Sequence, residues 1–206
     1  MPRSFSLATV LLVASIVRAG PTTRPDLSDP KKTYHALAAA YAAGDSKAVQ
    51  ACYYAKNDVE KKSIAALADF GTAYLNFKAA VKAKFGANGE NLVENDRVPL
   101  GPEADALRRV DAGKIEYHGD MAVLTVDAPE EFKELIKTQR ATFHKTPEGW
   151  KIDFSSSPFH DDSAEVRDAF TQAYAKNAAT YNRLLAEVNS GKFPTLEALE
   201  KRLDEE

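Results

Sequence analysis

The chain has 206 residues, a formal net charge of −3 at neutral pH and a hydrophobic fraction of 44%. Its charges are of both signs and interspersed, and no basic stripe could follow a phosphate backbone, so the composition argues against nucleic-acid binding. The apolar content is sufficient for a folded core. The length suits one domain of about 100–200 residues with an appendage.

Residues 1–19 predict a secretory signal peptide. Arg3 precedes an uncharged apolar run, LATVLLVASIV, and Val17 and Ala19 suit the minus-three and minus-one positions of a cleavage site. The alternative is an N-terminal buried helix. The run is shorter than the ~20 residues that span a bilayer, and no later stretch approaches that length. We therefore expect a secreted or periplasmic protein, cleaved near Ala19, with no stable membrane insertion.

The single cysteine, Cys52, cannot form an internal disulfide, and it excludes a zinc site built from several thiolates. It lies in an apolar helical stretch beside Tyr53 and Tyr54. This setting predicts a buried, inert thiol rather than a reactive or intermolecular one.

A first helix is predicted over residues 30–43. Asp29 can cap it, and Pro30 suits its first position, where no backbone donor is needed. Gly44 supplies the left-handed stop. The preceding segment, 20–28, is polar and proline-rich, which predicts a flexible leader.

Two more helices are expected before the strands. Asp45 is placed to cap a second helix over about 46–55, and Asn57 or Asp58 caps a third that ends at Gly86. In this third helix apolar residues recur every three or four positions, which indicates one buried stripe. The stripe consists of Ile64, Leu67, Phe70, Tyr74, Phe77, Val81 and Phe85.

Glycine, asparagine and proline over residues 86–103 predict a loop, after which the period changes to that of strands. The segment 113–127, GKIEYHGDMAVLTVD, alternates apolar and polar residues and predicts two strands joined by a tight turn. A third strand is expected over about 137–145 and a fourth within GWKIDFSS, 149–156. Residues 129–136 fit either a helical turn or the start of the third strand.

Residues 158–206 predict a C-terminal helical extension. Asp162 and Glu165 have capping-box spacing, and Thr195 is placed to cap a last short helix. The longer helix is expected to dock on the outer face of the sheet, covering Val123, although docking on a partner is an alternative. Its apolar stripe consists of Val166, Phe170, Ala173, Tyr174, Asn177, Tyr181, Leu184, Leu185 and Val188.

Helices followed by consecutive strands predict an α+β domain over residues 29–157, with about four antiparallel strands packed on three N-terminal helices. The segment 29–49, DPKKTYHALAAAYAAGDSKAV, resembles the opening of bacterial proteins of the nuclear-transport-factor-2-like superfamily, in which a first helix ends in Gly-Asp and a second begins at once. The segments GKIEYHGDMAVLTVD and TFHKTPEGWKIDF are similar to that family's strand pair and closing strand. The resemblance spans about residues 29–156.

This resemblance implies a secreted module of the ketosteroid-isomerase or SnoaL-like kind, with a cone-like curved antiparallel sheet that leaves a pocket at its open end. Members of the superfamily include isomerases, dehydratases, epoxide hydrolases and non-catalytic binding modules, so the fold does not settle the function. No catalytic motif of these enzymes is matched here, and no catalytic residue is carried over.

The alternation of the strands assigns residues to a concave, pocket-facing side. These residues are Ile115, Tyr117, Leu124, Gln139, Ala141, Phe143, Trp150 and Ile152. With two tyrosines from the helices, the candidate ligand-binding residues are Tyr41, Tyr74, Tyr117, Gln139, Phe143 and Trp150, although a tyrosine more often simply packs its ring. Asp127 and His144 fall on the opposite face, so a proton-transfer pair in the pocket would need a one-residue register slip.

We expect no cofactor and no metal. The four histidines show no metal-ligand spacing, and there is no glycine-rich phosphate loop. His160 to Asp162 could bind a cation, but helix capping explains Asp162 more simply.

These observations lead us to expect a non-enzymatic secreted or periplasmic module that binds a small apolar molecule or a protein partner through the cone-shaped pocket. Two alternatives are open. One is a pocket enzyme of isomerase or dehydratase type that uses proton transfer. The other is a structural or assembly protein, in which a homodimer forms through the outer face of the sheet.

Overall fold

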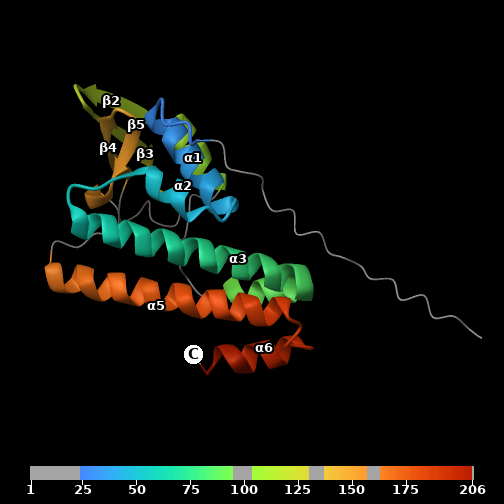
Figure 1. Cartoon of the computed structure of the whole chain (residues 1–206). Coiled ribbons are helices and arrows are strands. Elements are labelled where there is room, and N and C mark those ends of the chain that lie inside the picture. Colours follow the sequence, from blue (N-terminus) through green and yellow to red (C-terminus); the bar gives the residue numbers. More distant parts are fainter. Residues whose placement is uncertain (1–23, 95–103, 130–136, 157–162, 206) are drawn as a thin grey trace, which may run out of the picture.

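The computed structural model describes residues 24–94, 104–129, 137–156 and 163–205. The predicted signal peptide lies outside these residues. The described chain combines a mixed sheet with six α-helices, which confirms the α+β prediction (Figure 1). None of the described helices is long and apolar enough to cross a membrane.

The first two helices follow the local signals. Helix α1 spans Pro30–Ala42, and the carboxylate of Asp29 accepts a hydrogen bond from the N–H of the second helical residue at 2.8 Å. Gly44 has φ +66°, and Asp45 caps α2, Ser46–Ala51, by accepting from a backbone N–H at 2.9 Å. The Gly-Asp break is therefore a helix stop followed at once by a helix cap, as predicted.

The sheet has five strands in the order β1-β5-β4-β3-β2, one more than predicted. The four predicted strands are antiparallel, but the short β1 pairs in parallel with β5, so the sheet is mixed. The prediction that the second helix continues to residue 55 is wrong, because the two tyrosines after Cys52 form β1. Aromatic residues suit strands, and the carbonyl of Cys52 accepts from the Ile152 N–H at 2.9 Å. The strands are β1 Tyr53–Tyr54, β2 Lys114–His118, β3 Met121–Asp127, β4 Thr138–Thr146 and β5 Gly149–Asp153.

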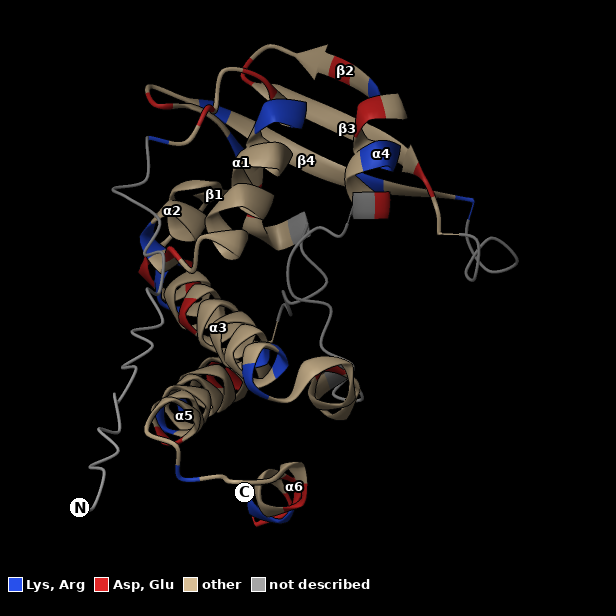
Figure 2. Cartoon of the chain, turned by 90° about the vertical axis from the view of Figure 1, so that its right-hand side faces the viewer, with Lys and Arg blue, Asp and Glu red and all other residues tan. Residues whose placement is uncertain are grey.

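One face of the sheet, here called the inner face, is covered by helices. Helix α1 lies over it together with α4, Ala104–Ala112, a segment for which the sequence predicted neither helix nor strand (Figure 2). Phe143 on β4 is completely buried and meets the ring of Tyr34 on α1 edge-on at 5.7 Å. The strand register places the predicted concave residues on this face, which confirms their parity.

The end of the predicted leader packs against the same core. Leu27 is buried, and its carbonyl accepts from the Trp150 N–H at 2.7 Å. Gly149 has φ +126°, and an added Cβ would collide with the Leu27 carbonyl. The chain is therefore fixed to β5 before α1 begins.

Helix α3 spans Asp58–Glu94 and continues past the residue where we predicted its end. At Gly86 the backbone takes φ +68° and ψ −152°, which interrupts the helical conformation and kinks the helix. The signal for a stop was correct locally, because Gly86 adopts a conformation that favours glycine. Helical residues nevertheless resume after it.

Helix α5, Ala164–Asn189, runs parallel to α3 (Figure 1). Ser63 contacts Thr171 near the start of both helices, at 2.8 Å between the hydroxyls, and Lys84 reaches the Val188 carbonyl near their ends. The apolar stripe of α5 therefore packs on α3, and the prediction that it covers the outer face of the sheet is wrong. These helices and α6 share a cluster of buried residues: Phe70, Ala73, Tyr74, Phe77, Val81, Val93, Ala178, Leu184, Val188, Phe193 and Leu199.

The C-terminal caps are partly as predicted. Thr195 caps α6, Leu196–Leu203, by accepting from a backbone N–H at 3.3 Å. Ser163, one residue after the predicted cap, caps α5 by accepting from the Val166 N–H, whereas Asp162 lies outside the described residues.

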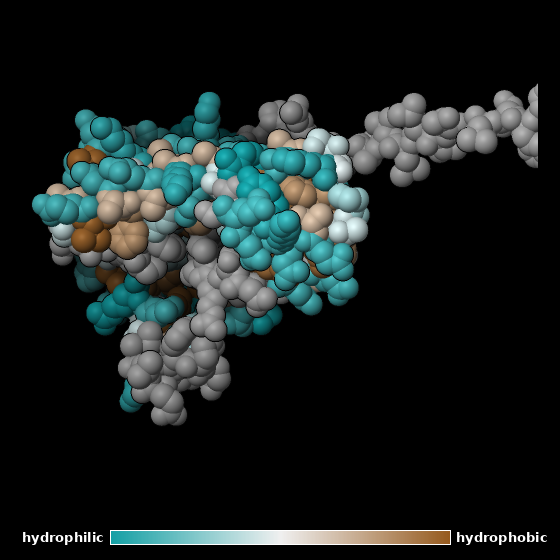
Figure 3. Space-filling model, turned by 90° about the horizontal axis from the view of Figure 1, so that it is seen from below, coloured by the Kyte–Doolittle hydropathy of each residue, from teal (hydrophilic) through white to brown (hydrophobic). Residues whose placement is uncertain are grey.

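Figure 3 views the molecule from the α6 side and shows apolar atoms toward the end where α5 begins. Near the start of α5, Val166 and Phe170 are 37% and 45% exposed.

Candidate functional site

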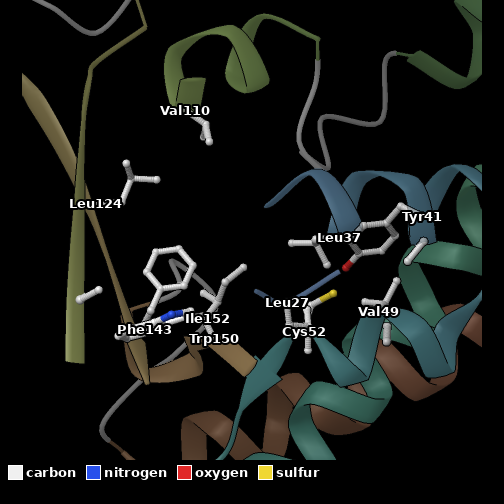
Figure 4. Packing of buried hydrophobic residues seen from close by; sticks show 13 residues of the cluster. Leu27, Leu37, Tyr41, Val49, Cys52, Val110, Leu124, Phe143, Trp150 and Ile152 are labelled. Carbon is white, nitrogen blue, oxygen red and sulfur yellow. The ribbon is translucent and has the colours of Figure 1, made fainter. Parts of the chain in front are cut away.

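Three of the six predicted pocket residues lie in the core over the inner face. Tyr41, Phe143 and Trp150 are all buried in one cluster with side chains of α1 and α2 (Figure 4). Burial raises the pKa of the Tyr41 hydroxyl, and its ring lies so close to Gly71 that an added Cβ there would be 2.5 Å from Cε1. These side chains pack against neighbouring elements of the fold.

The other three predicted residues lie apart from that cluster. Tyr74 belongs to the α3–α5 cluster, and its hydroxyl donates to the Val93 carbonyl at 3.0 Å. Tyr117 is 54% exposed, and its hydroxyl donates to Asp29 at 3.1 Å. Gln139 is exposed on β4. The structure therefore does not bring the six predicted residues together at one site.

A groove between α3, α5 and α6 is a second candidate, which the sequence did not suggest. Its volume is about 350 Å³, near the lower end of the ~300–1,000 Å³ typical of ligand sites. Five of its nine lining residues are polar, and the apolar ones come from all three helices, with Leu184 completely buried. The lining residues are Leu92, Lys176, Asn177, Thr180, Tyr181, Leu184, Glu200, Leu203 and Asp204.

Five polar side chains line this groove and have no partner among the described residues. Lys176, Asn177 and Thr180 come from α5, and Glu200 and Asp204 come from the end of α6. None of these five side chains makes a hydrogen bond or ion pair with a described residue. The groove thus combines a few apolar side chains with charged and polar groups, most of which are exposed to solvent.

A third candidate is a His–Asp couple on the other, outer face of the sheet. His144 Nε2 lies 2.9 Å from Asp153 Oδ2, and the imidazole stacks on Tyr54 with ring centroids 4.2 Å apart. Asp153 is only 5% exposed; its other oxygen accepts from the Ser155 N–H and hydroxyl at 2.9 and 2.7 Å. Lys56 Nζ lies 3.5 Å from Oδ2. Ser155 belongs to a 3₁₀ turn, η2, Phe154–Ser156, which follows β5 directly.

The charges around Asp153 keep it ionised. Burial raises the pKa of its carboxyl, but hydrogen bonds from Ser155 and His144 and the charge of Lys56 outweigh that effect, so the pKa lies below its ordinary value. An ionised carboxylate can accept an N–H from Nε2 of His144, and in that tautomer Nδ1 carries the lone pair. This is the arrangement by which a carboxylate orients an imidazole for general-base catalysis.

We did not foresee this couple from the sequence. The sequence places Asp127 and His144 on the outer face, and the structure keeps both there but at opposite ends of β3 and β4, since Asp127 pairs with Thr138 and Met121 pairs with His144. The signal for Asp153 was present, because the alternation along β5 places it on the same face as His144. Alternation assigns residues to a face of the sheet, but it does not show that Asp153 and His144 meet diagonally across the hairpin of β4 and β5.

Cys52 is inert, as predicted. It is completely buried, its Sγ donates to the Ala48 carbonyl at 3.3 Å, and burial raises the pKa of the thiol to about 12. Within the described ranges, no three His, Cys, Asp or Glu side chains gather closely enough to hold a metal ion. Neither cysteine chemistry nor such a metal centre is thus indicated by the residues that the structure describes.

Comparison of the chain with protein-family models, curated proteins and solved structures finds no match. Membership of the nuclear-transport-factor-2-like superfamily therefore stays a prediction from the sequence.

Proposed function

We propose that this protein is a non-enzymatic binding module that takes a small, largely apolar molecule in the groove between α3, α5 and α6. The observation that carries the proposal is a groove in which apolar side chains from three helices lie beside polar side chains that have no partner among the described residues. Ligand sites likewise combine apolar contact surface with polar groups that orient the bound molecule. A concave groove of this size favours a small molecule over a protein partner.

The proposal places the ligand away from the inner face of the sheet, where the sequence placed it. Phe143 and Trp150 are buried there against α1, so their apolar surface is already used in the fold. Secretion or export to the periplasm remains part of the proposal, on the strength of residues 1–19, and so does the superfamily, on the strength of the Gly44-Asp45 break and the meander of β2 to β5.

Octanol, an uncharged apolar probe, is expected to raise the melting temperature measured by calorimetry. A ligand present at a hundredfold excess over its dissociation constant stabilises the folded state by about 2.7 kcal/mol. Leu203→Ala should weaken this effect, because Leu203 lines the groove. Leu196→Ala, on the same helix and also half-buried but outside the groove, should retain it. An unchanged melting temperature in the parent protein, or equal shifts in both variants, would contradict the proposal.

A proton-transfer enzyme is the second candidate, and the His144–Asp153 couple favours it. It ranks below the binding module because the couple lies on the sheet face opposite α1, beside half-exposed side chains of β4 and β5 rather than in the groove. If the couple is catalytic, the parent protein should catalyse enolisation of a ketone substrate, and His144→Gln should not. NMR spectroscopy measures this reaction as deuterium exchange at the carbon next to the carbonyl. Exchange that continues at the parent rate in this variant would exclude His144 as the base.

A further inference from the structure

We infer that His118, Met121 and His144 form a binding site for a soft metal ion, Cu(I), on the outer face of the sheet. The two imidazoles and the thioether would hold the ion between them. This site is separate from the groove between α3, α5 and α6, so the inference goes beyond the proposed function and does not depend on it.

The strand register brings the three side chains into one row. His118 pairs with Met121 across β2 and β3, and Met121 pairs with His144 across β3 and β4, three strands that lie side by side (Figure 2). Directly paired residues of an antiparallel sheet share a face. Since adjacent strands lie about 4.8 Å apart, the two histidines flank the methionine across a gap of about 10 Å. An ion above Met121 would be within reach of both imidazoles, because each has only half of this gap to cover.

His144 is held in an orientation that suits a metal ligand. Its Nε2 lies 2.9 Å from Asp153 Oδ2 on β5, and its ring stacks on Tyr54. The two nitrogens of an imidazole lie on different edges of the ring, so Nδ1 would face away from β5, toward Met121 on β3. A metal-bound histidine commonly donates its other N–H to a carboxylate, which fixes the ring and raises its basicity. Asp153 would serve His144 in this way, as a positioning residue.

The other two ligands are open to an ion from solvent. Met121 is 42% exposed, so its thioether is accessible. His118 is exposed as well, and its Nε2 lies 3.9 Å from Glu116 Oε2, a charge that favours a cation nearby. Lys151 is the next residue of the row beyond His144, but its Nζ lies 3.4 Å from a carboxylate oxygen of Glu148, which offsets its charge.

The ligand set selects the metal. A thioether is a soft ligand that favours Cu(I), and imidazole also suits copper. Zinc sites are built from Cys, His, Asp and Glu, and among the described residues no three side chains of these types gather closely enough to hold an ion. We expected no metal from the sequence, because the ligands show no spacing typical of a metal site along the chain. The register of three strands is what assembles them.

The test is competition for Cu(I) with bicinchoninate, a coloured chelator, on the full chain in anaerobic solution at neutral pH. We expect the parent to bind Cu(I), and Met121→Leu and His118→Gln each to weaken binding about tenfold or more. Both side chains are exposed, so these variants should fold like the parent. His35→Gln is the matched control, an exposed histidine that contacts Asp111 outside the row, and it should bind like the parent.

X-ray absorption at the copper edge identifies the ligands directly. The parent should show sulfur and imidazole nitrogen around Cu(I), and the sulfur signal should disappear in Met121→Leu. Absence of sulfur in the parent, or equal Cu(I) affinity in the parent and Met121→Leu, would overturn the inference. Either outcome would leave the proposed function intact, since the groove between α3, α5 and α6 shares no residue with this row.

Discussion

Replacing Phe143 with alanine is expected to lower the free energy of unfolding by about 3–5 kcal/mol. Phe143 has no exposed surface, meets Tyr34 edge-on and belongs to the cluster between the sheet and α1. Truncation of such a ring leaves a cavity that the neighbouring elements only partly close. Urea unfolding followed by circular dichroism measures the change as a shift in midpoint at unchanged slope.

The matched control for this variant is Gln139→Ala. Gln139 lies on the same strand and the same face as Phe143 but is exposed, so its replacement should change the free energy of unfolding by no more than about 0.5 kcal/mol. The pair of variants also discriminates between two interpretations of the inner face. If Phe143→Ala is tolerated as well as the control, the inner face is a ligand pocket, as we expected from the sequence, and not a packed core.

Asp153→Asn is expected to lower the free energy of unfolding at neutral pH by about 2 kcal/mol, the magnitude of hydrogen bonds to a charged group. The carboxylate is 5% exposed and accepts from Ser155 and His144, with Lys56 close by. An amide cannot accept all these hydrogen bonds, and it leaves Lys56 without the opposite charge. Asp127→Asn, an exposed acid on the same face of the sheet, is the control and should have almost no effect.

The effect of Asp153→Asn should depend on pH in a defined direction. The pKa of Asp153 is lowered in the folded protein from its ordinary value of 3.8. A lowered folded-state pKa stabilises the protein above the unfolded-state pKa, and this stabilisation is lost as the pH falls through the folded-state pKa. The gap between the parent and the variant should therefore be full at pH 7 and close progressively in acid. A gap that is constant from neutral to strongly acidic pH would show that the ionised carboxylate is not its source.

The candidate sites were less accessible to sequence reasoning than the secondary structure. Alternation correctly placed Phe143 and Trp150 on the inner face of the sheet, but it could not show that α1 fills the space above them. The groove was missed because its lining comes from three helices far apart in the chain. Glu200 and Asp204 line the same groove as Leu92 and Lys176, and no local sequence pattern connects these residues.

The sequence by itself determined the features that depend on a few neighbouring residues. Asp29, Gly44 and Asp45 specify where helices begin and end, because capping involves backbone groups within one turn. Alternation likewise determined the faces of β2 to β5. Tertiary structure decided the rest: β1 exists because β5 lies beside it, and α5 packs on α3 rather than on the sheet. The physical reason is that an apolar stripe requires burial of one helix face, yet it does not specify the surface that buries it.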